Sequence, residues 1–321
     1  MGKPTYVKNN IHGLLPIWKT TGMSSKDVSR RLESVFGKIK CGHAGTLDIA
    51  AEGVLPILIG NATRLQDFLV DLPKTYVFEL DLGYETDTLD LEGEVIKRAD
   101  VPLITEQQVR AALSPFEGKI RQVPPVYSAI KYKGRPLYDY ARAGELELLP
   151  DMDSFGRDVL IYSIDLKEFN LTKLRVEVTC SKGTYIRVLG QAIAHSLKTL
   201  GTISYLSRTK SSGVDRDGCV DLDKVLEQPL ETFVVATQDL KLGLPKWKSV
   251  LPIWTDRLKK GQKLIVKSEL FDHGLQQDDS AVDFTDKREV LLIKDSGTVL
   301  GLGHIVAKEN GDYSVNLFRG L

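Results

Sequence analysis

The segment Gly42-His43-Ala44-Gly45-Thr46-Leu47-Asp48 sets a single carboxylate at the end of a short glycine-containing stretch. Gly42 and Gly45 carry no side chain, so the backbone there can approach a ligand closely. An aspartate after such a turn is more often a turn or cap residue than a catalyst. A lone carboxylate on this kind of loop can also act as a nucleophile or a base, provided that it stays ionised. Asp48 is therefore the first candidate catalytic residue.

Regular elements flank this segment on both sides. A helix is predicted from Ser24 to Gly37, because a serine can cap the free amides and glycine is a common helix end. Asp27 falls in the first turn, near the positive end of the helix dipole. The apolar run 53–60 has the length and the flanking glycines of a short buried strand. Asp48 is thus expected on the connection between a helix and a strand.

The elements farther along the chain indicate the fold class. Apolar and polar residues alternate over 76–82 and again over 174–180, which predicts two half-buried strands. Helices are expected over 106–114 and 187–198. Because strands and helices do not alternate regularly, the pattern favours an α+β mixed sheet over a doubly wound one.

The last quarter of the chain has the pattern of a separate small unit. Residues 242–246 resemble a linker, and strand-like runs follow at 264–266, 290–293 and 313–318. An acidic loop is expected from Asp278 to Asp286. We therefore predict one domain over residues 1–245 and a small β-rich domain over residues 246–321.

The charge of the chain is balanced overall but unevenly distributed. The 321 residues include 43 basic and 43 acidic side chains, so the formal net charge is zero. This balance argues against nucleic-acid binding, because nucleic-acid binders are often basic. Residues 1–50 are mainly basic, however, and residues 79–100 are mainly acidic. A basic face with an acidic back is compatible with RNA binding, although a charge run is usually only a solvated face.

The sequence gives no sign of a metal site or a membrane segment. The three cysteines, Cys41, Cys180 and Cys219, form no CxxC pair and the histidines have no ligand spacing, so we predict no metal. The thiols are expected to be reduced in a cytoplasmic protein. The first ten residues lack an apolar segment of the signal-peptide type, and no apolar run approaches membrane-spanning length.

A second candidate residue follows from Gly183-Thr184-Tyr185-Ile186-Arg187, at a predicted strand-to-helix turn. An arginine at a helix start opposes the helix dipole, so it is either an ordinary surface residue or has a specific anionic partner. An adjacent arginine would favour the ionised form of a carboxylate such as Asp48. Composition and pattern alone thus indicate a two-domain α+β protein with one carboxylate site.

Several segments, in the expected order over roughly residues 11–245, resemble the motifs of the TruB-type pseudouridine synthases. One such motif would be a weak signal, but several in register are hard to obtain by chance. The segments are 42–48 with 53–56 and 60–64, then Lys74-Thr75-Tyr76, 86–93, 122–131, 180–187 and 206–209. Stretches 258–262 and 299–303 look like a PUA-type RNA-binding module.

The sequence departs from the family pattern in three places. Ile49 replaces the proline that usually follows the aspartate, which loosens the turn but leaves the carboxylate. Lys19-Thr20-Thr21-Gly22 stands where the family has Lys-Pro-x-Gly. The segment 148–156 is also atypical, so its RNA contacts do not follow from the resemblance.

The resemblance implies a mainly antiparallel sheet and an isomerisation of uridine to pseudouridine in the TψC arm of tRNA, at position 55, without cofactor or metal. It implies that Asp48 is the essential carboxylate and that Arg187 pairs with it. Tyr76 would stack on the flipped uracil and could assist the late proton removal at C5, although without its context it would be taken for an ordinary strand aromatic. Tyr185 would hydrogen-bond near the pocket, and Leu206 would pack its floor.

RNA contacts are implied for four further residues. His43 is a candidate to fill the space left by the flipped base or to contact neighbouring bases, whereas a lone histidine is more often structural. Lys19, Arg64 and Lys131 are candidate phosphate contacts. The implied partner is tRNA, and we expect a monomer.

Two alternatives stay open. A guide-RNA-dependent synthase of the dyskerin type would share the motifs, but such chains typically carry basic tails, and this sequence ends at Leu321 without one. A non-catalytic RNA chaperone could keep the fold, but Asp48, Tyr76 and Arg187 are all present. Folding assistance to tRNA could still accompany catalysis.

Overall fold

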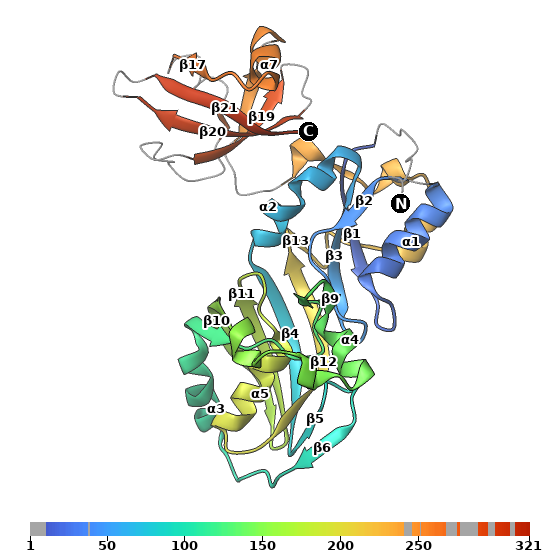
Figure 1. The fold of residues 1–321 in the computed structure, drawn as a ribbon, viewed down its shortest axis with the longest axis vertical. Coiled ribbons are helices and arrows are strands. Elements are labelled where there is room, and N and C mark those ends of the chain that lie inside the picture. Colours follow the sequence, from blue (N-terminus) through green and yellow to red (C-terminus); the bar gives the residue numbers. More distant parts are fainter. Residues whose placement is uncertain are drawn as a thin grey trace.

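The computed structural model describes residues 11–37, 39–240, 246–250, 252–267, 275–276, 288–294, 299–308 and 312–321. In this part of the chain a large sheet with helices against it is followed by a smaller sheet at one end (Figure 1). Residues 242–245 of the predicted linker over 242–246, and the acidic loop from Asp278 to Asp286, lie outside the described residues, and Lys246 begins a strand.

The large sheet has 11 strands, eight of which follow the order β14-β1-β3-β12-β4-β11-β10-β7. Its β1–β14 and β3–β12 pairings are parallel and its other described pairings are antiparallel, which confirms the mixed, mainly antiparallel prediction. The strands are β1 (Gly13–Lys19), β2 (Cys41–His43), β3 (Glu52–Ile59), β4 (Lys74–Leu82), β7 (Gly118–Gln122), β10 (Arg157–Asn170), β11 (Lys173–Cys180), β12 (Gly201–Ser211), β13 (Val214–Asp215), β14 (Val220–Asp221) and β15 (Val235–Ala236).

Helix α1 (Ser25–Phe36) forms where its sequence signals predict it. Ser24 Oγ accepts a hydrogen bond from the Asp27 amide at 3.1 Å, and the Asp27 carboxylate accepts one from the Ser24 amide at 3.2 Å. This reciprocal cap satisfies two amides that the first turn leaves free. The helix ends at Gly37, whose φ of 77° favours glycine.

Helices α3 (Glu106–Leu113) and α5 (Ile186–Ser196) pack against the sheet, α3 mainly on β10 and α5 on β12. Their apolar residues join those of β4 and β11 in one buried cluster that includes Phe78, Val109 and Leu189. None of the described helices is both long and apolar enough to cross a bilayer. The other helices are α2 (Gln66–Asp71), α4 (Leu137–Ala143), α6 (Leu222–Leu226) and α7 (Pro252–Lys259), with 3₁₀ turns η1 (Gly60–Leu65), η2 (Ser114–Phe116), η3 (Leu146–Leu148), η4 (Met152–Phe155), η5 (Leu230–Thr232) and η6 (Thr237–Asp239).

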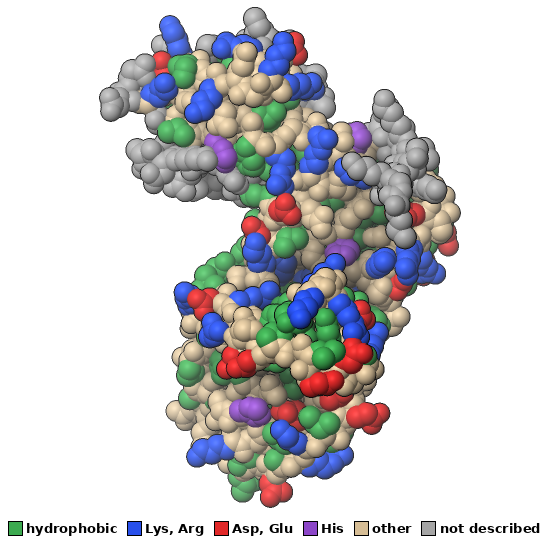
Figure 2. Space-filling model, in the orientation of Figure 1, with side chains coloured by type: hydrophobic (Ala, Val, Ile, Leu, Met, Phe, Trp, Pro, Cys, Tyr) green, Lys and Arg blue, Asp and Glu red, His purple; other side chains and the backbone are tan. Residues whose placement is uncertain are grey.

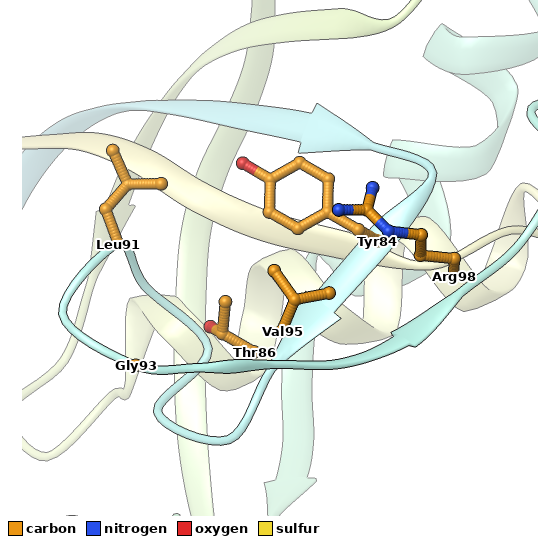
Figure 3. A pocket seen from close by; sticks show the side chains of 6 residues that line it. All are labelled: Tyr84, Thr86, Leu91, Gly93, Val95 and Arg98. Atoms are coloured by element: carbon orange, nitrogen blue, oxygen red, sulfur yellow. The ribbon is translucent and has the colours of Figure 1, made fainter.

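Two short hairpins extend from the large sheet. The first joins β5 (Tyr84–Thr86) to β6 (Val95–Arg98), and the second joins β8 (Lys131–Tyr132) to β9 (Arg135–Pro136). A cavity of about 310 Å³ lies beside the first hairpin and is lined by Tyr84, Thr86, Leu91, Gly93, Val95 and Arg98 (Figure 3). No residue that the sequence singles out for catalysis or RNA contact lines it, so it is not assigned to the substrate.

The C-terminal sheet has six strands in the order β17-β21-β20-β19-β16-β18. It has a core of its own, which includes Val250, Leu258 and Ile305. This small β-rich unit is the expected PUA-like part of the fold. Its strands are β16 (Lys246–Val250), β17 (Leu264–Val266), β18 (Leu275–Gln276), β19 (Arg288–Lys294), β20 (Val299–Ala307) and β21 (Tyr313–Gly320).

The C-terminal sheet packs against η1 and α2. Leu65 and Leu69 share a buried cluster with Leu291 and Leu302. Polar contacts border this cluster: Arg64 Nη1 donates to the Gly320 carbonyl at 2.8 Å, and Arg319 Nη1 lies 3.2 Å from Asp67 Oδ2. The two sheets are therefore joined by apolar packing as well as by the chain.

Candidate active site

The loop that carries Asp48 connects β2 to β3 and is held from several sides. Ser25 Oγ contacts both backbone groups of Leu47, accepting from its amide at 2.9 Å and donating to its carbonyl at 3.1 Å. The Ile49 carbonyl accepts from the Gly22 amide at 2.9 Å. Gly45 has a φ of 105°, a backbone conformation that favours glycine. The loop therefore presents the Asp48 side chain from a fixed backbone.

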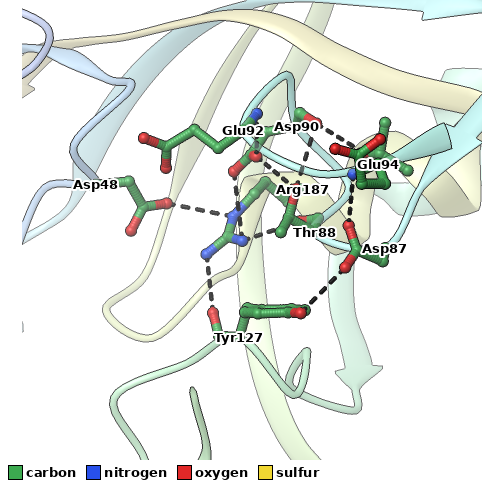
Figure 4. Close-up of polar contacts among 9 residues, drawn as sticks. Asp48, Asp87, Thr88, Asp90, Glu92, Glu94, Tyr127 and Arg187 are labelled. Atoms are coloured by element: carbon green, nitrogen blue, oxygen red, sulfur yellow. Dashed lines mark hydrogen bonds and ion pairs between the residues drawn. The ribbon is translucent and has the colours of Figure 1, made fainter. Parts of the chain in front are cut away.

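Asp48 pairs with Arg187, as the resemblance implies. Arg187 Nε lies 3.2 Å from Asp48 Oδ2, and the side chains are 9% and 43% exposed, respectively. Arg187 lies in the first turn of α5, where an arginine opposes the helix dipole unless an anion compensates it. The predicted anionic partner is thus present (Figure 4), and the carboxylate stays partly exposed.

The same guanidinium has further partners on its other side. Arg187 Nη1 lies 3.4 Å from Asp90 Oδ2 and donates to the Thr88 carbonyl at 2.9 Å. Arg187 Nη2 donates to the Tyr127 carbonyl at 3.2 Å. Figure 4 shows the planar group between Asp48 and the loop that carries Asp90. The arginine is therefore fixed from two sides, and it holds Asp48 in turn.

Asp90 is a member of the site that the sequence reasoning missed. It is 6% exposed, and its other oxygen accepts from Thr88 Oγ1 at 2.7 Å and from the Glu92 amide at 3.0 Å. The signal was available, because Asp90 belongs to the 86–93 motif, but its role was not assigned. Burial raises the pKa of the nearby Glu92, and the charges of Asp90 and Asp48 raise it further. Asp48, Asp90 and Glu92 thus place negative charge around Arg187.

Tyr76 and Leu206 come from neighbouring strands of the large sheet. On β4, Tyr76 pairs with Val178 of β11 on one side and with Arg208 of β12 on the other. Burial raises the pKa of the Tyr76 phenol above its usual range, and the charge of Arg208 offsets part of that rise. The phenol is therefore protonated near neutral pH. Tyr76 and Leu206 both pack against the main core cluster, and their contacts to a uracil stay predictions.

His43 ends β2, directly before the Asp48 loop, and Tyr185 lies directly before α5. The His43 Nδ1 atom is buried and has no hydrogen-bond partner within the described ranges. Burial lowers the His43 pKa, and the Arg208 charge lowers it further, so the ring is neutral near pH 7. Tyr185 precedes α5, and its ring stacks under the Arg157 guanidinium, 4.9 Å from the ring centroid. Their roles toward RNA stay predictions.

The three candidate phosphate contacts differ in placement. Arg64 and Lys131 are exposed, although Arg64 also holds the C-terminal sheet through Gly320. Lys19 is 1% exposed, and its ammonium donates to the carbonyls of Thr20 and Met23 at 2.9 and 2.8 Å. A third bond, at 3.4 Å, reaches the Ile49 carbonyl. This placement corrects the Lys19 expectation, because an ammonium enclosed by carbonyls is an anchor for the loop and does not face a phosphate.

The surface charge is mixed. On the face shown in Figure 2, Lys and Arg side chains are spread over both the large sheet and the C-terminal unit, and a group of Asp and Glu side chains lies near α4. Among the described residues no group of three or more His, Cys, Asp or Glu side chains is arranged to hold a metal ion.

These observations define a class of protein: an α+β enzyme-like fold in which a loop aspartate is held by a buried arginine at a helix start. A model of the TruB family pseudouridylate synthase N-terminal domain matches residues 33–186. The protein named tRNA pseudouridine synthase B from Francisella philomiragia is 38% identical, with 86% of this chain and 87% of the relative covered. The protein of the same name from Hydrogenovibrio crunogenus is 36% identical, with 80% and 82% covered. The chain therefore belongs to the TruB family of pseudouridylate synthases, and it is an isomerase.

Solved structures agree on the fold. A chain in the crystal structure of a Cbf5-Nop10-Gar1 complex has a TM-score of 0.67 at 21% identity, with 93% of this chain and 79% of that chain covered. A chain in the structure of an H/ACA RNP bound to a substrate RNA containing 2'-deoxyuridine has a TM-score of 0.67 at 19% identity, with 96% and 84% covered. At these identities the likeness establishes the architecture alone.

Proposed function

We propose that this chain converts uridine to pseudouridine in the TψC arm of tRNA, at the position numbered 55, with Asp48 as the essential carboxylate and without a cofactor. The observation that carries the proposal is the Asp48–Arg187 pair, in which the arginine is buried and the carboxylate is 43% exposed. The relatives named tRNA pseudouridine synthase B support tRNA as the substrate, because they match most of the chain.

The reaction balances without any outside group. The N1–C1′ bond of the nucleotide breaks, the uracil turns, and a C5–C1′ bond forms. The proton on C5 is then removed and N1 gains one, so nothing is oxidised or reduced. Asp48 can act on the sugar or the base, and Arg187 holds it in place through a charge-assisted hydrogen bond. No step requires a metal or a cofactor.

The target base has to leave its stack before Asp48 can reach it. Extrusion of a base costs roughly a few kcal/mol. Stacking on an aromatic ring returns roughly 1–3 kcal/mol per base. Tyr76 is the proposed stacking partner. Because its phenol is protonated near neutral pH, it could assist proton removal at C5 only by passing its own proton to another base or to water. His43, Tyr185 and Leu206 would complete the pocket, and Arg64 and Lys131 would contact phosphates.

The C-terminal unit is proposed to bind RNA as a PUA-like module, with the domain boundary near residue 245. Its position on η1 and α2 places it close to exposed Arg64. Positive side chains in both units could then track one RNA backbone. Such contacts supply affinity and fix the register of the RNA, and they leave the choice of uridine to the catalytic site.

The proposal is tested with purified protein and an unmodified tRNA transcript, in buffer with EDTA and without any other RNA. Pseudouridine should appear at position 55, and a transcript with cytidine at that position should stay unmodified. A requirement for an added guide RNA would favour the dyskerin-type alternative. Binding of the transcript without conversion would favour the chaperone alternative, and either result would overturn the proposal.

A further inference from the structure

Arg208 is an arginine enclosed in the large sheet directly behind the Asp48 loop. Its side chain is 1% exposed, and its guanidinium donates to the carbonyls of Val54, Thr46 and Gly45 at 2.8, 3.1 and 3.1 Å. Within the described part of the chain, Arg208 forms no salt bridge with a carboxylate. A buried charge without a counter-ion is costly unless hydrogen bonds replace its lost hydration. These three carbonyls do so, and the guanidinium and the loop conformation therefore depend on each other.

A glycine on the neighbouring strand makes this placement possible. Arg208 of β12 pairs in parallel with Gly53 of β3, whose φ is 126°. A Cβ atom at Gly53 would lie 2.3 Å from the Arg208 carbonyl oxygen and 2.6 Å from its nitrogen. Any side chain there would push the strands apart. The bare backbone at Gly53 thus lets β12 bring its arginine under the loop that leads into β3.

Arg208 also adjoins the strand that carries Tyr76. The two residues are direct partners in the antiparallel pairing of β12 with β4. Burial raises the pKa of Tyr76, and both the charge of Arg208 and a hydrogen bond from it act in the opposite direction. One side chain thus contacts the loop of the proposed catalytic carboxylate on one side and the proposed stacking tyrosine on the other.

We infer that Arg208 is a positioning residue that fixes the Asp48 loop and the Tyr76 ring relative to each other for the isomerisation. The inference rests on the proposed function. The planar guanidinium reaches two successive loop carbonyls at once, at Gly45 and Thr46. A lysine would keep the charge but could not span both in one plane. The loop is then held by geometry that only arginine supplies.

The effect of the Arg208 charge can be measured separately, through the pKa of His43. Burial is the main reason that the pKa of His43 is lowered, and the Arg208 charge lowers it further. Arg208→Met should therefore raise the His43 pKa, and Arg208→Lys should leave it close to the wild-type value. A pH titration of the His43 ring signal by NMR measures this difference without reference to catalysis.

The test compares the wild type with Arg208→Lys and Arg208→Met. Leu113→Ala serves as a control for lost stability, because Leu113 is buried on α3 in the main core cluster and is not part of the site. Three quantities are measured: the single-turnover rate with enzyme in excess, the tRNA Kd, and hydrogen exchange over residues 44–51. We expect both Arg208 variants to lose on the order of 10²-fold in rate, as for a misplacement of about 1 Å. The Kd should change less than about threefold, since phosphate contacts dominate affinity.

The rate of hydrogen exchange over residues 44–51 should rise in both Arg208 variants. It should not rise in Leu113→Ala when the two kinds of variant are compared at the same loss of Tm. If Arg208→Met does not fold, Arg208→Lys still decides the matter, because it keeps the charge and nearly the length. Wild-type rate and wild-type loop exchange in Arg208→Lys would overturn the inference, as would losses that merely follow Tm. An inactive wild type would count against the proposed function instead, and loop exchange would still test the positioning role.

Discussion

Arg187 Nε lies 3.2 Å from Asp48 Oδ2 in an ion pair whose arginine side chain is buried and whose carboxylate is 43% exposed. The arginine can be held so firmly because its outer nitrogens bond Thr88 and Tyr127, and Asp90 lies 3.4 Å away. Arg187 thereby orients the carboxylate from its buried side, and the exposed side stays accessible to a substrate.

Replacement of Arg187 should damage both stability and turnover. Arg187→Met leaves Asp90 buried without its cation, and loss of one partner of a buried pair typically costs ~3–5 kcal/mol. Arg187→Lys keeps the charge but loses the planar fork, so it should recover only part of the rate. Urea unfolding and the rate at saturating tRNA measure the two effects. Full activity in the Met variant would show that Asp48 does not need this partner.

The pH dependence of stability should report the burial of Lys19. Burial lowers the pKa of Lys19 from its ordinary 10.5 to about 8. Between these values the unfolded chain binds more protons than the folded one, so the free energy of unfolding rises with pH in this window. The wild type should therefore gain on the order of 1–3 kcal/mol relative to Lys19→Met from pH 7 to pH 10. Lys74 has a similarly lowered pKa but is common to both proteins, so its effect cancels. A difference that stays flat or shrinks would contradict the buried ammonium.

Affinity for tRNA should depend on salt in spite of the zero net charge. Each phosphate contact adds to the slope of log Kd against log salt concentration. Lys131→Gln and Arg64→Gln should each reduce that slope by roughly 1. Lys97→Gln is the matched control, because Lys97 is exposed on β6 within the acidic segment 79–100. Equal slopes for all three variants and the wild type would remove both residues from the RNA interface.

Local sequence signals account for much of the fold. Ser24, Asp27 and Gly37 predict α1 to within about a residue, because a cap and a helix stop act over a few residues. The alternation over 76–82 and 174–180 likewise marks β4 and β11, which prove to be direct neighbours. The 14-residue strand β10 was not predicted. It forms a hairpin with β11, which follows it directly, but its pairing with β7 joins segments that lie apart in the sequence.

Local sequence signals predict only part of the candidate site. Asp48 and Arg187 could be named from their motifs, and the structure brings them together. Lys19 and Arg208 are cations, and a Lys or Arg side chain in a sequence normally indicates a surface position. Both are buried on strands that have other strands paired on both sides, and only tertiary structure determines that. The pairing of Arg208 with Gly53 likewise depends on strand register and not on local pattern.

The most direct test of the central claim is the turnover of Asp48→Asn on unmodified tRNA transcript, measured beside its tRNA affinity. The amide is nearly isosteric with the carboxylate, so the loop held by Ser25, Lys19 and Arg208 should survive the change. The amide cannot act as a nucleophile or a base. We predict a rate lowered on the order of 10⁴-fold or more, with a Kd close to that of the wild type. Pseudouridine formation by Asp48→Asn at a rate comparable to that of the wild type would contradict the assignment of Asp48 as the catalytic carboxylate.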